Sequence, residues 1–517
     1  MNYTYRYIAQ ITIEAQSAFA INSGKVGLLH DNVVSKDANG LPYIPGTSLA
    51  GIIRHAAIKN GIAEEIFGNG GSEGFGSRVL FSPGLMVGEN GKVVEGLKDL
   101  DFNDGFYSHF KQLPYRDHVK INDRGTAVDR AKFDEELVFK GTRFVFEIEL
   151  VGNQDDQQSW EKLLKLINSP EFRIGSGTRK GHGNFSPIEE VCFQVIYDLA
   201  QKEELEAYLT KSASLNQILP KSSPLKFEDT AINNWKRYGL KLTPNNFFLF
   251  GAGYGDEEAD RVGKKEKYIR WEDGKPNLLE EDFILIPATS IKGALWHRVA
   301  FYYNNESGNV IGEPTNAQPP SKEFPIETFL DQLKGIREKT NIEVTSEDEV
   351  YENLIKEIEN FNFEEIDAWK KYMEYLEDEG VKISKSSTLS NDENKGVNEL
   401  FGFAKDSERK VSGKRGAVLL NDLYIPYDKK KEKVFNHVKI DRFTGGALDG
   451  ALFQEKAFHS NEPIELELWV ESSVLNDDQI KKAFEKSLDD LVSGNLPLGG
   501  MTTKGHGFFK GEKLEKK

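Results

Sequence analysis

The sequence repeats four short motifs in the same order, and this internal repeat constrains the architecture more than any other feature. The motifs read Ile-Pro-x-Thr-Ser, Phe-Gly, His-Val-Lys-Ile and Lys-Gly-His-Gly. They begin at Ile44, Phe67, His118 and Lys180 in the first copy and at Ile286, Phe401, His437 and Lys504 in the second. Self-similarity of this kind indicates a tandem duplication. We interpret residues 1–199 as a first module, 200–235 as a connection and 236–517 as a second module.

Each copy shows the periodicity of a mixed α+β module. Apolar and polar residues alternate in Tyr3–Ile13 and again in Tyr238–Leu242, as in a strand with one buried face. A helical run follows each Thr-Ser pair, and Thr or Ser just ahead of such a run is the expected N-cap. Further strand and helix patterns follow in each copy, at Phe144–Leu150, Trp160–Ile167, Ile464–Val470 and Ile480–Leu491. This order predicts an α+β fold of two tandem ferredoxin-like modules, the layout of an RRM.

The second copy carries an acidic insertion. It is longer than the first copy between the shared motifs, and the extra residues coincide with an acidic segment of helical pattern at about 303–398. Most of the net charge of −17 lies there, so the modules themselves are much less acidic than the total suggests. We interpret the segment as a solvated surface insert, and the alternative is a docking surface for a partner subunit. Its charge would repel nucleic acid, so it should lie away from a phosphate-binding groove.

Composition indicates a cytoplasmic protein. The single cysteine, Cys192, excludes an internal disulfide framework and fits a reducing compartment. The N-terminus lacks the apolar core of a signal peptide, and no apolar run is long enough to cross a bilayer. We therefore expect no membrane partner.

Two glycine-rich loops carry the strongest chemical signal. Gly175–Gly183 and Gly499–Gly507 both end in Lys-Gly-His-Gly. Glycines let backbone amides approach a phosphate closely, and basic side chains supply charge. A flexible glycine turn ahead of a strand is the alternative, but the basic residue recurs in both copies. The candidate phosphate- and ribose-binding residues are Arg179, Lys180, His182, Thr503, Lys504 and His506.

The Thr-Ser pairs form a second candidate group. They sit at predicted helix N-termini, where free amides and the helix dipole favour anions. Plain capping is the alternative explanation. With the basic residues of the same helices, the candidates are Thr47, Ser48, Arg54, Thr289, Ser290, Lys292 and Arg298.

A third group follows the His-Val-Lys-Ile motifs. These segments lead into Asp123-Arg-Gly-Thr126 and Asp441-Arg-Phe-Thr444, and later into Phe133 and Phe453. A solvent-facing hairpin is one interpretation. The other is a projecting finger that contacts a nucleic-acid strand through Lys120, Arg124, Lys439 and Arg442.

Other site chemistries fit poorly. The glycine loops lack the Gly-Lys-Ser/Thr of a P-loop, and Gly46–Gly51 misses the spacing of a nucleophile elbow by one residue. The nine histidines and one cysteine never gather at zinc spacing. A magnesium ion held by a carboxylate and by RNA phosphates stays compatible with the sequence.

These motifs in this order resemble the RAMP superfamily of CRISPR-associated proteins, specifically the repeated backbone subunits of type III effector complexes. Asp31-Asn-Val-Val34, followed by Leu41–Gly51, is similar to that family's N-terminal signature. The Asp-Arg-x-Thr segments resemble its thumb hairpin, and the two glycine-rich loops resemble its glycine-rich loop. Two fused modules in one chain resemble the type III-D arrangement.

The resemblance implies a function. Modules of this family line up along a CRISPR RNA, and their thumbs kink the duplex between this guide and a target single-stranded RNA. A loop aspartate then promotes cutting of the target with Mg²⁺ or another divalent cation, and Asp31 holds the matching position. The implied partners are other RAMP backbone subunits and the large polymerase-like subunit. A purely architectural guide-binding subunit and a CRISPR RNA-processing ribonuclease are the alternatives.

The second copy departs from the family pattern. Ala288 replaces Gly46, and no Asp-Asn-Val-Val precedes it. Aligning Val33-Val34 with Tyr268-Ile269 puts Glu266 opposite Asp31, and Asp256 and Asp260 lie on the same longer loop. The second copy therefore either cuts through one of these acids or only binds.

Overall fold

A computed structural model describes residues 3–24, 32–62, 66–70, 74–121, 126–227, 234–279, 283–306, 394–403 and 412–514. The chain divides into two compact units, one formed by Met1–Tyr303 with Lys395–Lys517 and the other by Asn304–Asn394. The acidic insertion expected at about 303–398 lies almost entirely outside the described residues.

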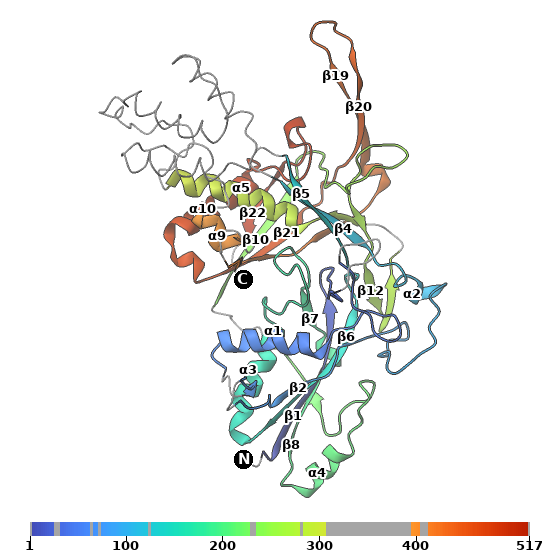
Figure 1. Cartoon of the computed structure of the whole chain (residues 1–517), viewed down its shortest axis with the longest axis vertical. Helices are drawn as coiled ribbons and strands as arrows, with labels where there is room; N and C mark the ends of the chain where they lie inside the picture. Colours follow the sequence, from blue (N-terminus) through green and yellow to red (C-terminus); the bar gives the residue numbers. More distant parts are fainter. Residues whose placement is uncertain are drawn as a thin grey trace, which may run out of the picture. The chain divides into compact units, whose positions relative to one another are not determined.

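The first module is a ferredoxin-like sheet with two covering helices (Figure 1). Strand β1 is central and pairs antiparallel with β6 on one side and with β7 and β8 on the other. The sheet order β2-β6-β1-β8 is that of a split βαβ module. The elements are β1 (Tyr5–Ala15), α1 (Gly46–Lys59), β2 (Val79–Phe81), β3 (Leu85–Met86), β6 (Arg143–Gly152), α3 (Gln157–Ile167), β7 (Phe185–Pro187) and β8 (Phe193–Asp198).

The second module repeats this topology. Strand β10 is central, and the order β17-β21-β10-β22 matches that of the first sheet. Its elements are β10 (Trp235–Pro244), α5 (Ala288–Glu306), α9 (Lys395–Phe401), β17 (Val418–Leu420), β21 (Ile464–Glu471), α10 (Asp478–Ser493) and β22 (Phe509–Leu514). The predicted α+β class with two ferredoxin-like modules is confirmed.

The predicted periodicities correspond to buried faces. In α3 the apolar stripe of Trp160, Leu163, Leu164 and Ile167 is buried in the first core, and α10 buries an equivalent stripe in the second. Asp477 caps α10 by accepting from the amides of Gln479 and Ile480. Burial of these stripes is what fixes each helix on its sheet.

The expected Thr-Ser caps are wrong by position. Helix α1 begins at Gly46, so Pro45 is its N-cap residue, and no side chain caps it. The carbonyl of Pro45 accepts from Ser48, and that of Pro287 accepts from Ser290 in the same way. Proline favours this helix start because its fixed φ suits the position. Thr47, Ser48, Thr289 and Ser290 therefore lie inside the first helical turns.

Each module also carries a long hairpin at the sequence of its predicted finger. Strand β4 (Tyr115–Ile121) pairs with β5 (Ala127–Glu136), and β19 (Glu432–Ile440) pairs with β20 (Ala447–Phe458). Both hairpins contain a register shift at the equivalent place, between Val119 and Ile121 and between Val438 and Ile440. Figure 1 shows β19 and β20 as a projecting arm. We call these hairpins thumb 1 and thumb 2.

The remaining elements are short. The connection contains helix α4 (Lys202–Leu209) and strand β9 (Ser223–Pro224), which pairs with β8. The others are α2 (Gly105–Ser108), β11 (Lys265–Glu266), β12 (Ile269–Glu272), β13 (Lys275–Leu278), β14 (Phe283–Ile286), β15 (Gly402–Phe403), β16 (Lys414–Arg415) and β18 (Leu423–Pro426). Among the described residues, no helix is both long and apolar enough to span a membrane.

Candidate functional site

The loop that precedes each first helix has the same hydrogen-bond register in both modules. The amides of Ser23 and Ser35 bond to the carbonyls of Val33 and Ile21, and the amides of Ala252 and Lys264 bond to those of Val262 and Phe250. The next backbone contact also matches, because Asn32 forms an isolated parallel β-bridge with Glu135 and Arg261 forms one with Glu455. Val33 is thus equivalent to Val262, which makes Asp260 the counterpart of Asp31.

This register corrects the alignment made from the sequence. Val33 matches Val262 and not Tyr268, because the loop of the second copy is extended after Glu266 by the hairpin β12–β13. In this register Glu266 is the counterpart of Asp37. Its carboxylate is buried and lies 2.6 Å from the Arg116 guanidinium. Asp31 itself lies outside the described residues, as does Arg124.

The two other acids of the second loop differ in their contacts. Asp260 is exposed, and one carboxylate oxygen accepts from the amide of Gln454 at 2.7 Å. Asp256 accepts from the amides of Glu258 and Ala259 and contacts the Lys456 ammonium at 2.5 Å. The Lys456 contact, chiefly, lowers the pKa of Asp256. Asp256 therefore closes its own turn, whereas Asp260 faces solvent.

An aromatic ring at the base of each thumb gathers the basic side chains. The Lys180 ammonium lies 4.3 Å from the Phe133 ring centroid, and that of Lys504 lies 4.1 Å from Phe453. The Arg261 guanidinium lies 5.2 Å from the Phe453 ring as well. In the second module, the thumb, the glycine loop and the loop of Asp260 therefore meet at one ring.

A buried glutamate holds each thumb to its glycine loop. Glu135 lies 2.8 Å from His118 of the thumb and 3.4 Å from His182 of the loop. Glu455 lies 3.0 Å from both His437 and His506. Both glutamates and both loop histidines are buried. Sequence reasoning missed Glu135 and Glu455, although each stands two residues after the repeated phenylalanine.

Charges in the first of these clusters favour an ionised glutamate and a neutral histidine. Burial alone would raise the pKa of Glu135, but His118 and His182 outweigh it and bring the value to about 2. Burial, and then the neighbouring Arg116 guanidinium, lowers the pKa of His182 from 6.5 to about 3. The Arg116 guanidinium lies 3.2 Å from Nε2 of His182. Because a guanidinium can only donate, Nε2 accepts and the imidazole proton belongs on Nδ1, which faces Glu135.

The glycines of the two loops satisfy backbone requirements. Gly175, Gly181 and Gly183, like Gly499, Gly505 and Gly507, have positive φ. A side chain at Gly183 would strike the carbonyl oxygen of Ile174, and one at Gly507 would strike that of Leu498. Both loops also close with the same bond, from the amide of His182 to Gly177 and from that of His506 to Met501. The loops are thus built alike.

Several predicted nucleic-acid contacts are occupied by protein. Arg179 donates to the carbonyl of Gly416 at 2.6 Å, and Lys292 donates to the carbonyls of Arg179 and Phe401, both at 3.2 Å. Arg54 donates to the carbonyl of Gly68, and Arg298 pairs with Asp490. Burial lowers the pKa of Lys292 to about 8. Among the described candidates, Thr47, Lys120, Lys439, Arg442, Thr503 and Lys504 are exposed at the surface.

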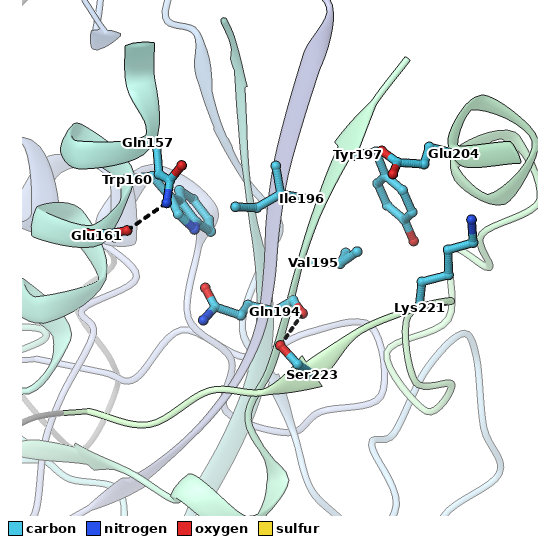
Figure 2. Close-up of a pocket in the computed structure, with 10 residues that line it drawn as sticks. All are labelled: Gln157, Trp160, Glu161, Gln194, Val195, Ile196, Tyr197, Glu204, Lys221 and Ser223. Carbon is cyan, nitrogen blue, oxygen red and sulfur yellow. Dashed lines mark hydrogen bonds between the residues drawn. The ribbon is translucent and has the colours of Figure 1, made fainter. Parts of the chain in front are cut away.

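A pocket in the first module contains none of the predicted residues. Figure 2 shows it beside β8, between α3 and the connection, with Trp160, Ile196 and Lys221 among its lining. Its side chains are mostly polar and include the hydrogen-bonded pair Gln157–Glu161. The candidate site is therefore the thumb base with its loops, and not this pocket.

Comparison with known proteins adds one finding. A family model described as the RAMP superfamily matches residues 12–186 and 269–510, which together make up most of the chain. The two matched stretches fall on the two modules. No curated protein matches the sequence.

Proposed function

Because the chain belongs to the RAMP superfamily, we propose that it is a CRISPR RNA-binding backbone subunit of a type III effector complex. In this proposal both modules hold the duplex of guide and target RNA, and each cuts the target strand at a kink. The fusion of two modules would correspond to a type III-D-like subunit, next to other RAMP subunits and the large polymerase-like subunit.

The observation that carries the cleavage proposal is the matching register of the two acidic loops. It supports Asp260 as the counterpart of Asp31, on a loop that meets the thumb and the glycine loop at Phe453. A ribose 2′-hydroxyl held in line can attack the adjacent phosphorus and expel the 5′-oxygen of the next nucleotide, which takes a proton from water, so that the products end in a 2′,3′-cyclic phosphate and a 5′-hydroxyl. A carboxylate beside that hydroxyl would accept its proton, and a basic side chain such as Lys504 would offset charge that develops on the phosphate.

A divalent cation fits this site only if the protein and the RNA share its coordination. Asp260 offers one exposed carboxylate, and the neighbouring Asp256 is engaged by Lys456. Mg²⁺ is commonly held by one or two carboxylates together with phosphates and water. Asp31 in the first module and Asp260 in the second would each hold one ion, and the RNA would supply the remaining ligands. When bound, the ion would supply positive charge near the cleaved phosphate.

The acid variants test this proposal in the assembled effector. Asp31→Ala and Asp260→Ala should each remove one cut from the target RNA product ladder, and the double variant should remove both. Guide binding should persist in all three. Asp256→Ala is the matched control, because Asp256 lies on the same loop but serves its own turn. An unchanged ladder in the double variant would leave a purely architectural, guide-binding subunit.

The CRISPR RNA-processing alternative receives less support. That chemistry generally uses a histidine as the base. His182 is fully buried and so has no access to a substrate, and burial lowers its pKa to about 3, which makes it a weak base. His118 and His437 are engaged by the buried glutamates. Cleavage of precursor repeat RNA by the isolated protein would revive this alternative.

A further inference from the structure

One edge of the sheet in the first module is left partly open. Strand β8 pairs with β1 along one edge, and β9 pairs with its other edge only at Phe193–Gln194. At the far end of that edge, the carbonyl of Asp198 accepts from the amide of Gln201 at 2.9 Å, and its amide donates to the Glu204 carboxylate. Ile196 lies on the uncovered stretch between these two ends.

The main-chain groups of Ile196 point toward this open edge. In an antiparallel pair, hydrogen-bonded and non-hydrogen-bonded positions alternate along the strands. The amide of Leu199 donates to the carbonyl of Thr4 at 2.8 Å, which marks a hydrogen-bonded position between β8 and β1. Tyr197 and Val195 are the next such positions along β8. Ile196 therefore directs its N–H and C=O away from β1, to a side on which no strand of the described residues pairs with it.

The chain beside β9 turns away from this edge. Just before β9, Lys221 has a φ of 59°, a left-handed conformation that is uncommon for a residue with a side chain. The chain lies there against the other face of the sheet, where the carbonyl of Pro220 accepts from the Tyr197 hydroxyl at 2.6 Å and Leu219 is buried. Strand β9 therefore does not continue alongside Ile196.

A buried donor lies next to the open edge. Trp160 is 1% exposed, and none of the residues that the structure describes accepts a hydrogen bond from its indole N–H. Buried indole N–H groups usually have a partner, because an unpaired one costs free energy. The fold does not need this donor, since the equivalent stripe of α10 buries Ile480 and Phe484, whose side chains have no polar atom. The Trp160 indole can therefore donate to a group of another molecule.

The Trp160 indole and the edge at Ile196 line the same pocket, which we call the edge pocket (Figure 2). Its volume of about 420 Å³ falls within the range of ligand sites, roughly 300–1,000 Å³. Figure 2 shows Trp160 and Glu161 on the same side of β8 as the Ile196 side chain. Glu204 and Lys221 lie on the other side.

The open groups define the chemistry of the ligand. The N–H and C=O of one strand residue bond to the C=O and N–H of the residue that faces it in an added strand. A further carbonyl of such a strand would supply an acceptor for the Trp160 indole. The open stretch, Val195–Tyr197, is short, because three residues of a strand span only about 10 Å. These groups therefore fit a few residues of extended peptide.

The charges at the pocket define one side chain of this peptide. Of the described residues of α3 that line the pocket, Glu161 alone is charged. One of its carboxylate oxygens accepts from the Gln157 side chain at 3.1 Å, and the residue is exposed. Lys221 lies across β8 beside Glu204 and leaves the charge of Glu161 uncompensated. A Lys or Arg of the peptide would complement this charge.

We propose that the edge pocket binds an extended, basic peptide segment of a partner protein, which adds a short strand to β8. One residue of the peptide pairs with Ile196, a neighbouring carbonyl accepts from Trp160, and a basic side chain lies against Glu161. In this mode of recognition, main-chain bonds supply affinity and side-chain contacts supply specificity. The proposal goes beyond the proposed function, because α3, β8 and the connection contain none of the predicted RNA-binding residues.

Selection of linear octapeptides from a phage-displayed library on the immobilised full chain tests the edge pocket. Selected peptides are synthesised, and their affinity is measured by isothermal titration calorimetry. Ile196→Pro removes the outward N–H at an edge position, where proline is tolerated, and leaves the bonds to β1 intact. This variant and Trp160→Phe should each weaken binding about 10-fold, the loss expected for one hydrogen bond. Ile218→Ala, at an exposed position of the connection outside the pocket, is the control and should bind as the wild type does.

Methylation of the peptide tests the main-chain pairing without any change in the protein. Replacing each peptide N–H in turn by N-methyl should abolish binding at the residue that faces Ile196 and spare the residues whose N–H points away from β8. Circular dichroism checks that Ile196→Pro and Trp160→Phe are folded. If either is not, the methylation series decides on the wild-type chain.

Three outcomes overturn the proposal. The first is a library that yields no peptide with a Kd below about 100 μM, an affinity of about −5.5 kcal/mol. The second is selected peptides that bind Ile196→Pro as tightly as the wild type, or that tolerate methylation at every position. The third is a single-stranded RNA whose binding Ile196→Pro weakens and Lys504→Met does not, which would assign the pocket to a nucleobase. Because the peptide assays contain no RNA, their outcome is independent of whether the proposed cleavage function holds.

Discussion

At the residue scale, the buried glutamates hold the candidate site together. Glu135 joins thumb 1 to its glycine loop through His118 and His182. We predict that Glu135→Gln lowers the free energy of unfolding by about 1–3 kcal/mol, because an uncharged amide interacts less strongly than the buried carboxylate with the imidazoles of His118 and His182. Thermal denaturation measures this loss. Glu161→Gln, on the exposed face of α3, should leave the melting temperature unchanged. An equal shift of the melting temperature in both variants would contradict the role of Glu135 in holding thumb 1 to its glycine loop.

The neutral state of His182 predicts a dependence on pH. Its pKa is about 3 in the fold and 6.5 as the ordinary value, so the unfolded chain binds a proton that the folded chain excludes between these pH values. The stability is complete above pH 6.5 and falls toward pH 3, by about 1.4 kcal/mol per pH unit for this group. Urea unfolding at several pH values in this range should show that the free energy of unfolding changes less steeply with pH for His182→Gln than for the wild type. His55→Gln, at an exposed position, should keep the wild-type slope.

The stacked lysines predict the response of RNA binding to salt. Lys504 is exposed over the Phe453 ring, where it can reach a phosphate. Lys504→Met should weaken single-stranded RNA binding and make the plot of log affinity against log salt shallower by about 0.7. Fluorescence anisotropy at several salt concentrations measures both effects. Lys202→Met on α4 is the matched control, and an identical slope in the two variants would contradict a phosphate contact.

At the element scale, the hairpin β12–β13 ties the second module to the first. Ile269 and Leu278 are buried in the first core, and the Trp271 indole donates to the carbonyl of Gly141 at 2.7 Å. Ile269→Ala should therefore cost about 2–5 kcal/mol of stability through the cavity it leaves. Chemical denaturation compares it with Lys275→Ala, an exposed position of the same hairpin. Equal effects would mean that the hairpin does not stabilise the first core.

The elements themselves were largely predictable from local pattern. The alternation at Tyr3–Ile13 and the stripe from Trp160 to Ile167 correspond to β1 and α3, because burial on one face repeats with the period of the element. The predicted helix starts lay too late in the sequence. Pro45 and Pro287 come directly before the helices, and the Thr-Ser pairs lie inside the first helical turns. Proline at a helix start competes with a side-chain cap, and the sequence pattern alone did not decide between them.

The long-range contacts of the site were not predictable in the same way. Lys504 is exposed, as expected of a phosphate ligand, and Lys180 is half-buried over the Phe133 ring, whereas Arg179, His182 and Lys292 are engaged by contacts within the protein. A basic residue in a glycine loop looks the same in both cases. Only the packing of one module on the other separates them, and that packing depends on residues as distant as Arg116 and Asp422.

At the scale of the whole molecule, duplication has kept the fold and changed the surfaces. Both modules have the same sheet order, the same clamped thumb and the same register at the acidic loop. A net charge of −17 is therefore compatible with RNA binding, because phosphate affinity depends on where the basic residues lie.

The central claim is that two equivalent modules follow one RNA strand. Photo-crosslinking from a benzophenone amino acid at position 133 or 453, in the assembled effector with its guide, tests it most directly. We expect both positions to crosslink to the same RNA molecule, at two sites separated by a constant number of nucleotides. Crosslinking from one module alone, or at nucleotides with no fixed separation, would contradict the account.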